Sequence, residues 1–474
     1  MASTMIAPTV VEELVAHDLV GEAAPSPAGP AEPQDMGLPL PPRVPLPRGV
    51  QILHMNARQI EFMFRWRRRL GDVFGANAIV AGGPTVICHP DHVRSLFTAN
   101  PELAPSLTAE SPLLPVVGPN SVLTANGPRH LRQRRLLLPP FHGEAIERYS
   151  RMIAQVTEQE IERWPVGRPF ALAPRTQSIT LDVIMSGILG VEGKPRRGTP
   201  EYGLRAAVKY VAAASTLPLY QLAELINLGH EEPVGLQARG IDILNRYTYA
   251  VINARRNVPD LEERTDILSL IMRARTEEGE PLTDRELRDE LLTLILAGFE
   301  TTANSMAWTW ERLVRTPDAY DRLREAVRSD EQADEHIEAT IVEAMRVRPV
   351  IPAIGRRVTV PWRLGDYVVP AGTPLIMSIV LVHHREDLYP QPFAFKPERW
   401  LGRKPGTYGW IPFGGGTRRC LGAALAMAEQ RVVMDAMVRR LDLEADDPEP
   451  ERVNHRNVTM IPRGGARVVI RARR

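Results

Sequence analysis

One long apolar segment constrains the fold of this chain more than any other feature. Thr283 and Glu286 have the spacing of a helix N-terminal capping box, and Pro317 follows the last residues with helical periodicity. The roughly 33 residues between these signals would form a helix of about 50 Å. The central part, LLTLILAGFETTANSMAW, is apolar on nearly every side, so we expect this helix to be buried inside a large domain.

The rest of the sequence predicts a mainly α protein with a small β region. Amphipathic stretches separated by Pro- and Gly-containing turns follow from about Leu53. The strand-like runs are short: AIVAGGPTVICHP, VTVPWRLGDYVVPAGTPLIM and VTMIPRGGARVVIRA. We find no repeat and no Gly/Ser linker, so residues 37–474 are predicted to form one domain. Residues 1–36, which include a Pro- and Ala-rich stretch, are predicted to be a flexible tail.

Composition and charge exclude several classes of protein. A net charge of +1 gives no reason to expect nucleic-acid binding. Cys88 and Cys420 are the only cysteines, so a secreted disulfide framework is not available and a cytoplasmic location is expected. Glu12, Glu13 and Asp18 interrupt the apolar residues near the N-terminus, where we therefore expect no membrane anchor and no signal peptide.

Two places carry residues that packing alone does not explain. In IPFGGGTRRCLGAALAM, Cys420 lies at the start of a predicted helix, whose N–H groups and dipole favour a thiolate that can bind a metal. An inert or redox-sensitive thiol is the alternative. In the long helix, Gly298 costs about 1 kcal/mol relative to Ala. The polar residues Glu300 and Thr301 follow it, either as a functional pair or as a buried kink with structural hydrogen bonds.

The segment around Cys420 resembles one family very specifically. It matches the cytochrome P450 haem-binding pattern F-G-x-G-x-R-x-C-x-G at each fixed position: Phe413, Gly414, Gly416, Arg418, Cys420 and Gly422. The chain thus resembles the soluble bacterial cytochromes P450 from about Gly49 onward. The resemblance implies a P450 fold, in which a large helical region surrounds haem b beside a small β-sheet region. It also implies Cys420 as the proximal iron ligand and Arg418 as a partner of a haem propionate.

Further segments match the same family in order and spacing. Residues 297–302 resemble the A-G-x-(D/E)-T-(T/S) signature of the central helix. The resemblance implies that a small residue at Ala297 or Gly298 gives room for dioxygen, and that Glu300 and Thr301 deliver protons.

Other matches concern haem binding and support of the cysteine segment. His130 and Arg134 match the (W/H)-x-x-x-R element that clasps a propionate, and Arg356 is expected to be another propionate partner, with Arg357 as the alternative. A pair three residues apart on a helix is ordinarily a weak surface salt bridge. Here it matches the E-x-x-R element of a structural triad formed by Glu343, Arg346 and Arg399.

The resemblance implies a monomeric monooxygenase that takes two electrons from a separate ferredoxin or flavodoxin and its NAD(P)H reductase. It would insert one atom of O2 into a lipophilic fatty acid, terpenoid or steroid by hydroxylation or epoxidation. Arg129, Arg132 and Arg135 form either a solvated basic face or a docking patch for that acidic donor. The predicted pocket combines residues 101–122 with Leu294, Val350, Ile351 and Ala353.

Three alternatives to this function remain. A peroxide-driven or isomerising haem-thiolate enzyme would need no electron donor, and the Glu300–Thr301 pair disfavours it because proton delivery to dioxygen would be superfluous. A non-catalytic haem sensor or carrier is the second. A merely structural Cys420 is the third. The adjacent His383 and His384 are weak evidence for a metal site and lie in a structural stretch of the family.

Overall fold

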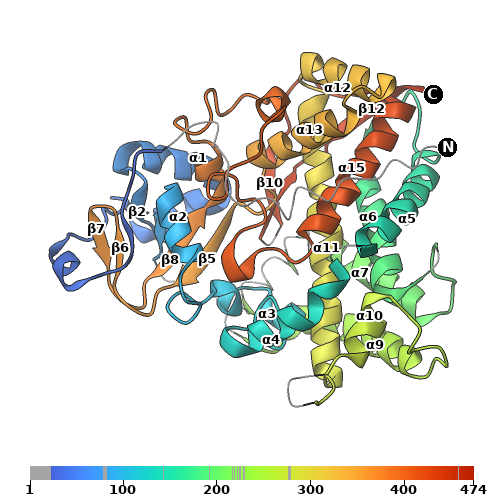
Figure 1. Ribbon diagram of the computed structural model, residues 1–474, viewed down its shortest axis with the longest axis horizontal. Coiled ribbons are helices and arrows are strands. Elements are labelled where there is room, and N and C mark those ends of the chain that lie inside the picture. The colour runs from blue at the N-terminus through green and yellow to red at the C-terminus, as the bar shows by residue number, and fades with distance from the viewer. Residues whose placement is uncertain are drawn as a thin grey trace.

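The computed structural model describes residues 23–77, 83–141, 144–191, 193–215, 217, 219–220, 223, 226–227, 230–275, 279–456 and 458–474. A helical region surrounds the long helix α11 (Asp284–Leu313), and a smaller region that contains most of the strands lies beside it, on the left of Figure 1. The prediction of a mainly α fold with a small β region is confirmed.

The structure contains α-helices and, between several of them, short 3-10 turns. The α-helices are α1 (Arg48–Leu70), α2 (Pro90–Phe97), α3 (Leu114–Val117), α4 (Gly127–Leu137), α5 (Glu144–Ile161), α6 (Ala173–Leu189), α7 (Pro200–Ala214), α9 (Gly235–Arg256), α10 (Ile267–Arg273), α12 (Pro317–Ser329), α13 (Ala333–Val347), α14 (Ile379–His383) and α15 (Ala423–Arg440). The 3-10 turns are η1 (Pro33–Gly37), η2 (Leu107–Glu110), η3 (Pro139–Phe141), η4 (Pro397–Trp400) and η5 (Gly416–Arg418).

Short strands form small sheets in the orders β1-β6-β7, β2-β3-β8-β5, β4-β12-β9 and β10-β11. Of these pairs, only β3 with β8 is parallel within the described ranges. The strands are β1 (Ala28–Pro30), β2 (Val73–Gly75), β3 (Thr85–Ile87), β4 (Phe170–Ala171), β5 (Ala353–Arg357), β6 (Trp362–Leu364), β7 (Tyr367–Val369), β8 (Pro374–Ser378), β9 (Leu441–Ala445), β10 (Val453–Arg456), β11 (Thr459–Pro462) and β12 (Arg467–Arg473).

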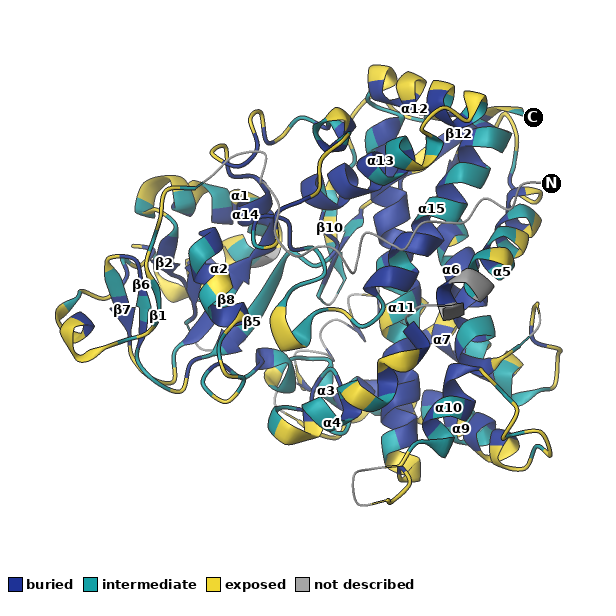
Figure 2. Ribbon diagram, in the orientation of Figure 1, coloured by how far each residue is buried: buried dark blue, intermediate teal, exposed yellow. Residues whose placement is uncertain are grey.

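Helix α11 begins as the sequence predicts. The Thr283 Oγ1 accepts a hydrogen bond from the Glu286 N–H at 3.2 Å, and the Thr283 N–H donates to the Glu286 carboxylate at 2.9 Å. The helix ends at Leu313, and Pro317 starts the next helix. Its 30 residues correspond to about 45 Å, and most of its length is buried (Figure 2). None of the described helices combines the length and the apolar composition needed to cross a bilayer.

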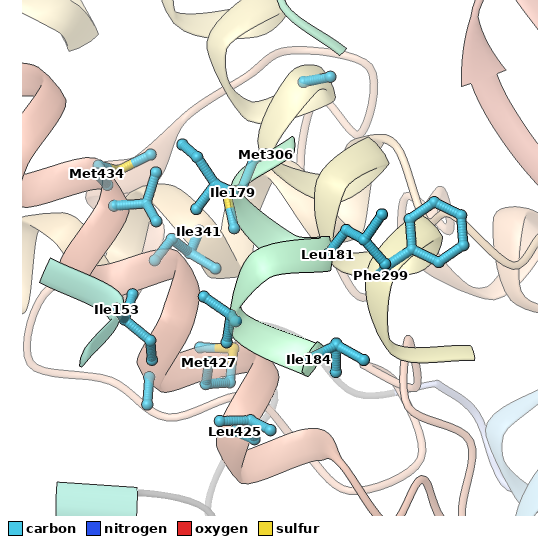
Figure 3. Packing of buried hydrophobic residues seen from close by; sticks show 14 of the residues in the cluster. Ile153, Ile179, Leu181, Ile184, Phe299, Met306, Ile341, Leu425, Met427 and Met434 are labelled. Carbon is cyan, nitrogen blue, oxygen red and sulfur yellow. The ribbon is translucent and has the colours of Figure 1, made fainter. Parts of the chain in front are cut away.

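The main apolar core lies where α6, α11, α13 and α15 meet. Figure 3 shows Ile179 and Ile184 from α6 packed with Met306 from α11 and Met427 from α15. A second cluster fills the strand-rich region and includes Phe74, Trp362 and other buried residues of α1, α2 and β8. The site described below draws on both regions, since Phe97 of α2 lines a pocket together with residues 413–416, and α15 begins at Ala423.

The N-terminal segment differs from the predicted tail over part of its length. Residues 1–22 lie outside the described residues. Residues 28–30 form β1, which pairs with β6, and the Ser26 hydroxyl is 2.8 Å from the His92 Nε2. The Asp35 carboxylate forms an ion pair with Arg363 at 2.8 Å. Residues 26–35 are therefore structured, because the β6 edge offers backbone partners that a local Pro- and Ala-rich pattern does not reveal.

Candidate functional site

The loop that carries Cys420 has a backbone that only glycine can follow. We call residues 413–422 the cysteine loop. Gly414 and Gly416 have φ values of 65° and 62°, in the left-handed region that favours glycine. A Cβ on Gly416 would lie 2.2 Å from the Phe97 carbonyl oxygen. The Cys420 N–H donates to the Phe413 carbonyl at 3.0 Å, which closes the loop just before α15 begins at Ala423.

The Cys420 thiol is accessible although protein surrounds it. Its side chain is exposed, yet burial raises the pKa of the thiol, against the opposing effects of the Gly422 N–H and of Arg134 and Arg419. The helix start alone predicted a favoured thiolate, and burial outweighs that effect. A buried thiol of this kind ionises when it binds a metal cation.

One residue in the middle of α11 is exposed. Ala297 is exposed although Leu294 and Phe299 on either side of it are buried. The Thr301 Oγ1 donates to the Ala297 carbonyl at 2.6 Å, the back-bond to the previous turn that the sequence suggested. Gly298 faces α6 and not the expected dioxygen site. A Cβ there would lie 2.5 Å from the Ile184 Cδ1, so this glycine allows α6 to pack closely against α11.

Glu300 has a partner that the sequence did not indicate. Its carboxylate forms an ion pair with the Arg456 guanidinium of β10 at 3.1 Å. Burial raises the pKa of Glu300, while Arg456 and the Thr459 hydroxyl lower it. The predicted acid is therefore held by the β10–β11 hairpin, and no sequence signal pointed to a hairpin so distant along the chain.

Four basic side chains gather near the cysteine loop. Burial together with the charges of Arg418, Arg134 and Arg356 lowers the pKa of His130 to about 3. Burial lowers the pKa of Arg356 to about 10, and burial with the neighbouring charges of Arg356 and Arg134 lowers that of Arg418 to about 10. The structure thus brings together the four basic residues that the sequence assigned to haem binding.

This cluster fits a group that carries carboxylates. Within the described ranges, no acidic side chain pairs with Arg356 or Arg418, whose hydrogen-bond partners are backbone carbonyls and the Asn126 side chain. Buried cations are costly unless an anion accompanies them. A haem, with its iron for Cys420 and its two propionates for these cations, has the required chemistry.

The two candidate propionate partners, Arg356 and Arg357, are neighbours on β5 and point in opposite directions. Arg356 is 6% exposed and lies in the basic cluster. Arg357 forms an ion pair with Glu110 at 2.5 Å, because successive side chains of a strand point to opposite faces. The geometry therefore supports Arg356 as the residue that faces the site.

The predicted triad is assembled, with Glu343 and Arg346 fully buried and Arg399 half-buried. The Arg346 guanidinium donates to both carboxylate oxygens of Glu343 at 2.8 Å, and Arg399 donates to the same carboxylate at 3.3 Å. Glu343 and Arg346 are each 0% exposed, which excludes the surface salt bridge that their spacing alone suggested. Sequence reasoning missed Trp400, whose indole N–H also donates to Glu343 at 2.9 Å.

The segments of the predicted pocket are joined to one another. The Val122 N–H donates to the Glu290 carboxylate of α11 at 2.9 Å, and the Asn120 amide donates to Asp289 at 3.0 Å. On the other side, Ser106 forms a β-bridge with Arg356. Leu294 and Val350 are buried, whereas Ile351 and Ala353 are half-buried.

The predicted basic patch on α4 is smaller than the sequence suggested. Arg132 forms an ion pair with Glu286 at the start of α11, so it does not stand free. Arg129 and Arg135 are exposed.

A pocket of about 140 Å³ adjoins the cysteine loop and is lined by Phe97, Tyr408, Trp410, Phe413 and Arg419, among others.

Comparisons with known proteins agree with this geometry. The Cytochrome P450 family profile matches residues 39–469. The chain is 36% identical over 452 residues to a protein of Mycobacterium tuberculosis named as cytochrome P450 137, covering 92% of each. It is 37% identical over 443 residues to one of Mycobacterium bovis named as cytochrome P450 138, covering 92% of this chain and 97% of that one.

Solved structures share the fold at lower identity. Retinoic acid-bound cyanobacterial CYP120A1 superposes with a TM-score of 0.75 at 23% identity, covering 92% of this chain and 100% of that one. The cytochrome P450 CYP102L1 gives a TM-score of 0.75 at 21% identity with the same coverage. From the profile match and the mycobacterial relatives, the chain belongs to the cytochrome P450 family of haem-thiolate monooxygenases.

Proposed function

We propose that this enzyme binds haem b through Cys420 and oxidises a lipophilic small molecule, using electrons from a separate ferredoxin or flavodoxin with an NAD(P)H reductase. The observation that carries the proposal is the basic cluster, which has no carboxylate partner among the residues that the structure describes, beside an accessible, desolvated Cys420. His130, Arg134, Arg356 and Arg418 would bind the propionates, and Cys420 would bind the iron.

The chain's own residues have separable tasks. When bound, the haem supplies the iron chemistry that activates dioxygen with two electrons. Glu300 would accept and release a proton at its carboxyl group, whose position Arg456 fixes. Thr301 carries a hydroxyl at Oγ1, which donates to the carbonyl of the exposed Ala297 one turn earlier in α11. These two groups would move protons from the hairpin side towards the centre of the site.

Apolar residues support a lipophilic substrate. Leu294, Val350, Ile351 and Ala353 provide the apolar surface, and residues 101–122 are pinned to α11 beside them. Such a lining favours a ligand whose surface is mostly apolar. Fatty acids, terpenoids and steroids are therefore the substrate classes that we propose for hydroxylation or epoxidation.

The electron donor would approach the side where Arg129 and Arg135 are exposed and where the pocket beside the cysteine loop opens. Exposed arginines steer an acidic protein and raise its association rate. Turnover by a cytoplasmic, monomeric enzyme of this kind would fall steeply as salt is added, since screening weakens such steering.

The reduced carbon monoxide difference spectrum tests the proposal. A thiolate-type Soret band supports it, whereas a histidine-type band or a protein that takes up no haem contradicts it. A screen for displacement of the iron-bound water would then rank fatty acids, steroids and terpenoids, including retinoic acid, which the similar CYP120A1 structure binds. Turnover with peroxide alone, equal to that with a donor and reductase, would favour the peroxide-driven alternative.

A further inference from the structure

Three consecutive residues that lead into the cysteine loop are each held by a side-chain hydrogen bond. The Tyr389 hydroxyl donates to the Gly409 carbonyl at 2.8 Å. The Trp410 indole N–H donates to the Val342 carbonyl of α13 at 3.1 Å. The Ile411 N–H donates to the His383 Nε2 at 2.8 Å. The backbone is thus fixed just before the loop begins.

His383 has a defined role in this arrangement. It is 0% exposed. Because its Nε2 accepts the Ile411 N–H, its Nδ1 carries the proton and donates to the Arg346 carbonyl at 3.2 Å. Burial, His384 and Arg346 lower the pKa of His383 well below its ordinary value, so the ring is neutral and keeps this tautomer.

Both residues also contact the guanidinium of Arg346, His383 through its backbone carbonyl and Tyr389 through its ring. That group donates to the His383 carbonyl at 2.8 Å and lies over the Tyr389 ring at 5.0 Å. The same guanidinium is fixed by Glu343. His383 and Tyr389 therefore connect the buried triad to residues 409–411.

The connection continues to the cysteine. The Gly414 N–H donates to the Ile411 carbonyl at 3.0 Å. The Cys420 N–H then donates to the Phe413 carbonyl at 3.0 Å. A shift of Ile411 would move the two glycine-dependent turns that set the direction of the Cys420 side chain.

We propose that His383 and Tyr389 are positioning residues that transmit the fixed geometry of the Glu343–Arg346 pair to Cys420. The proposal rests on the proposed role of Cys420 as the haem ligand. Groups behind a metal ligand commonly orient it in this way, and their loss costs roughly 10- to 100-fold in metal affinity. A purely structural buried histidine would instead affect stability and leave the ligand unchanged.

Two substitutions of His383 separate these possibilities. His383→Gln places an amide oxygen near the position of Nε2 and can still accept the Ile411 N–H. His383→Asn retains a polar group near Nδ1 and is too short to reach Ile411. His384→Asn is the matched control, because His384 is 4% exposed and its Nδ1 bonds the Val380 carbonyl of its own helix at 2.8 Å.

The experiment uses the full chain loaded with haem. Three quantities are measured: the thiolate-type share of the carbon monoxide spectrum, the rate of haem transfer to excess apomyoglobin, and the thermal unfolding midpoint. For His383→Asn we expect haem transfer about 10-fold faster and a larger non-thiolate share. We expect His383→Gln to restore most of the wild-type spectrum. His384→Asn should lower the unfolding midpoint without changing the spectrum.

Several results would overturn the inference. They are a wild-type spectrum and haem transfer rate in His383→Asn, equal losses in His383→Asn and His383→Gln, or the same loss in His384→Asn. If His383→Asn does not fold, Tyr389→Phe decides, since it removes only the hydroxyl bonded to Gly409: faster haem transfer supports the inference and an unchanged rate overturns it. A wild-type protein without a thiolate-type band would instead refute the proposed function.

Discussion

Glu300 and Arg456 form an ion pair that joins the centre of the longest helix to a hairpin 156 residues further along the chain. Burial raises the pKa of this carboxyl group and Arg456 lowers it, with Thr459 as the other group that faces it. The proton affinity of the proposed acid therefore depends on a residue outside its own helix.

Arg456→Gln should extend proton delivery to higher pH. Removing the guanidinium removes an effect that lowers the pKa of Glu300, so the carboxyl group stays protonated as the pH rises further. We measure coupling as the product formed per reducing equivalent across a range of pH. We expect its decline on the alkaline side to occur at a higher pH than in the wild type. Glu300→Gln in the same background should abolish the shift, and a decline at the wild-type pH in Arg456→Gln would refute this role.

Thr301→Ala should uncouple the enzyme. The substitution removes the Oγ1 hydroxyl next to Ala297, so reducing equivalents should be consumed with less product. Product and NAD(P)H consumption measured together give the coupling. Thr302→Ala is the control, because Thr302 is buried away from the accessible position. Tightly coupled turnover in Thr301→Ala would count against the assignment.

Arg356→Gln should weaken haem binding, while Arg357→Gln should not. Arg356 lies in the buried basic cluster, and its neighbour pairs with Glu110 at a partly exposed position. We expect haem transfer to apomyoglobin to be about 10-fold faster in Arg356→Gln, the scale of a lost supporting contact. Equal rates in the two variants would show that this strand does not bind a propionate.

Arg346→Ala should prevent haem incorporation. It leaves the Glu343 carboxylate buried without its main partner, at a cost of about 3 to 5 kcal/mol. Haem content per protein and the unfolding midpoint measure the effect. Arg322→Ala, which breaks an exposed pair with Glu398, should cost no more than about 1 kcal/mol. Normal haem content in Arg346→Ala would contradict the prediction.

Glu429→Gln should stabilise the protein at alkaline pH. Burial raises the pKa of Glu429 to about 8 from its ordinary 4.5, and within the described ranges its Oε1 has no partner. The folded state thus holds a proton that the unfolded state releases, so stability falls as the pH rises between those values, by about 1.4 kcal/mol per unit. Unfolding midpoints of wild type and variant should agree near the lower pKa and diverge as the pH rises. Parallel pH profiles would refute this.

Local signals in the sequence were sufficient to predict several features. The capping box at Thr283, the long apolar helix and the glycines before Cys420 were all read from a few neighbouring residues, because capping, periodicity and left-handed backbone depend on local geometry. The triad was predicted only through the family resemblance, since Glu343 and Arg346 by themselves look like an ordinary surface pair. The complete burial of that pair came from the structure.

The sequence by itself therefore determined the helix that runs through the domain, the loop that bears the cysteine and the family. Tertiary structure alone decided which residues meet across the fold: Arg456 with Glu300, Ile184 with Gly298, and His383 with Ile411. It also decided that burial outweighs the helix start at Cys420. The physical reason is that burial and side-chain partners arise where distant segments cross, and no local pattern of residues records those crossings.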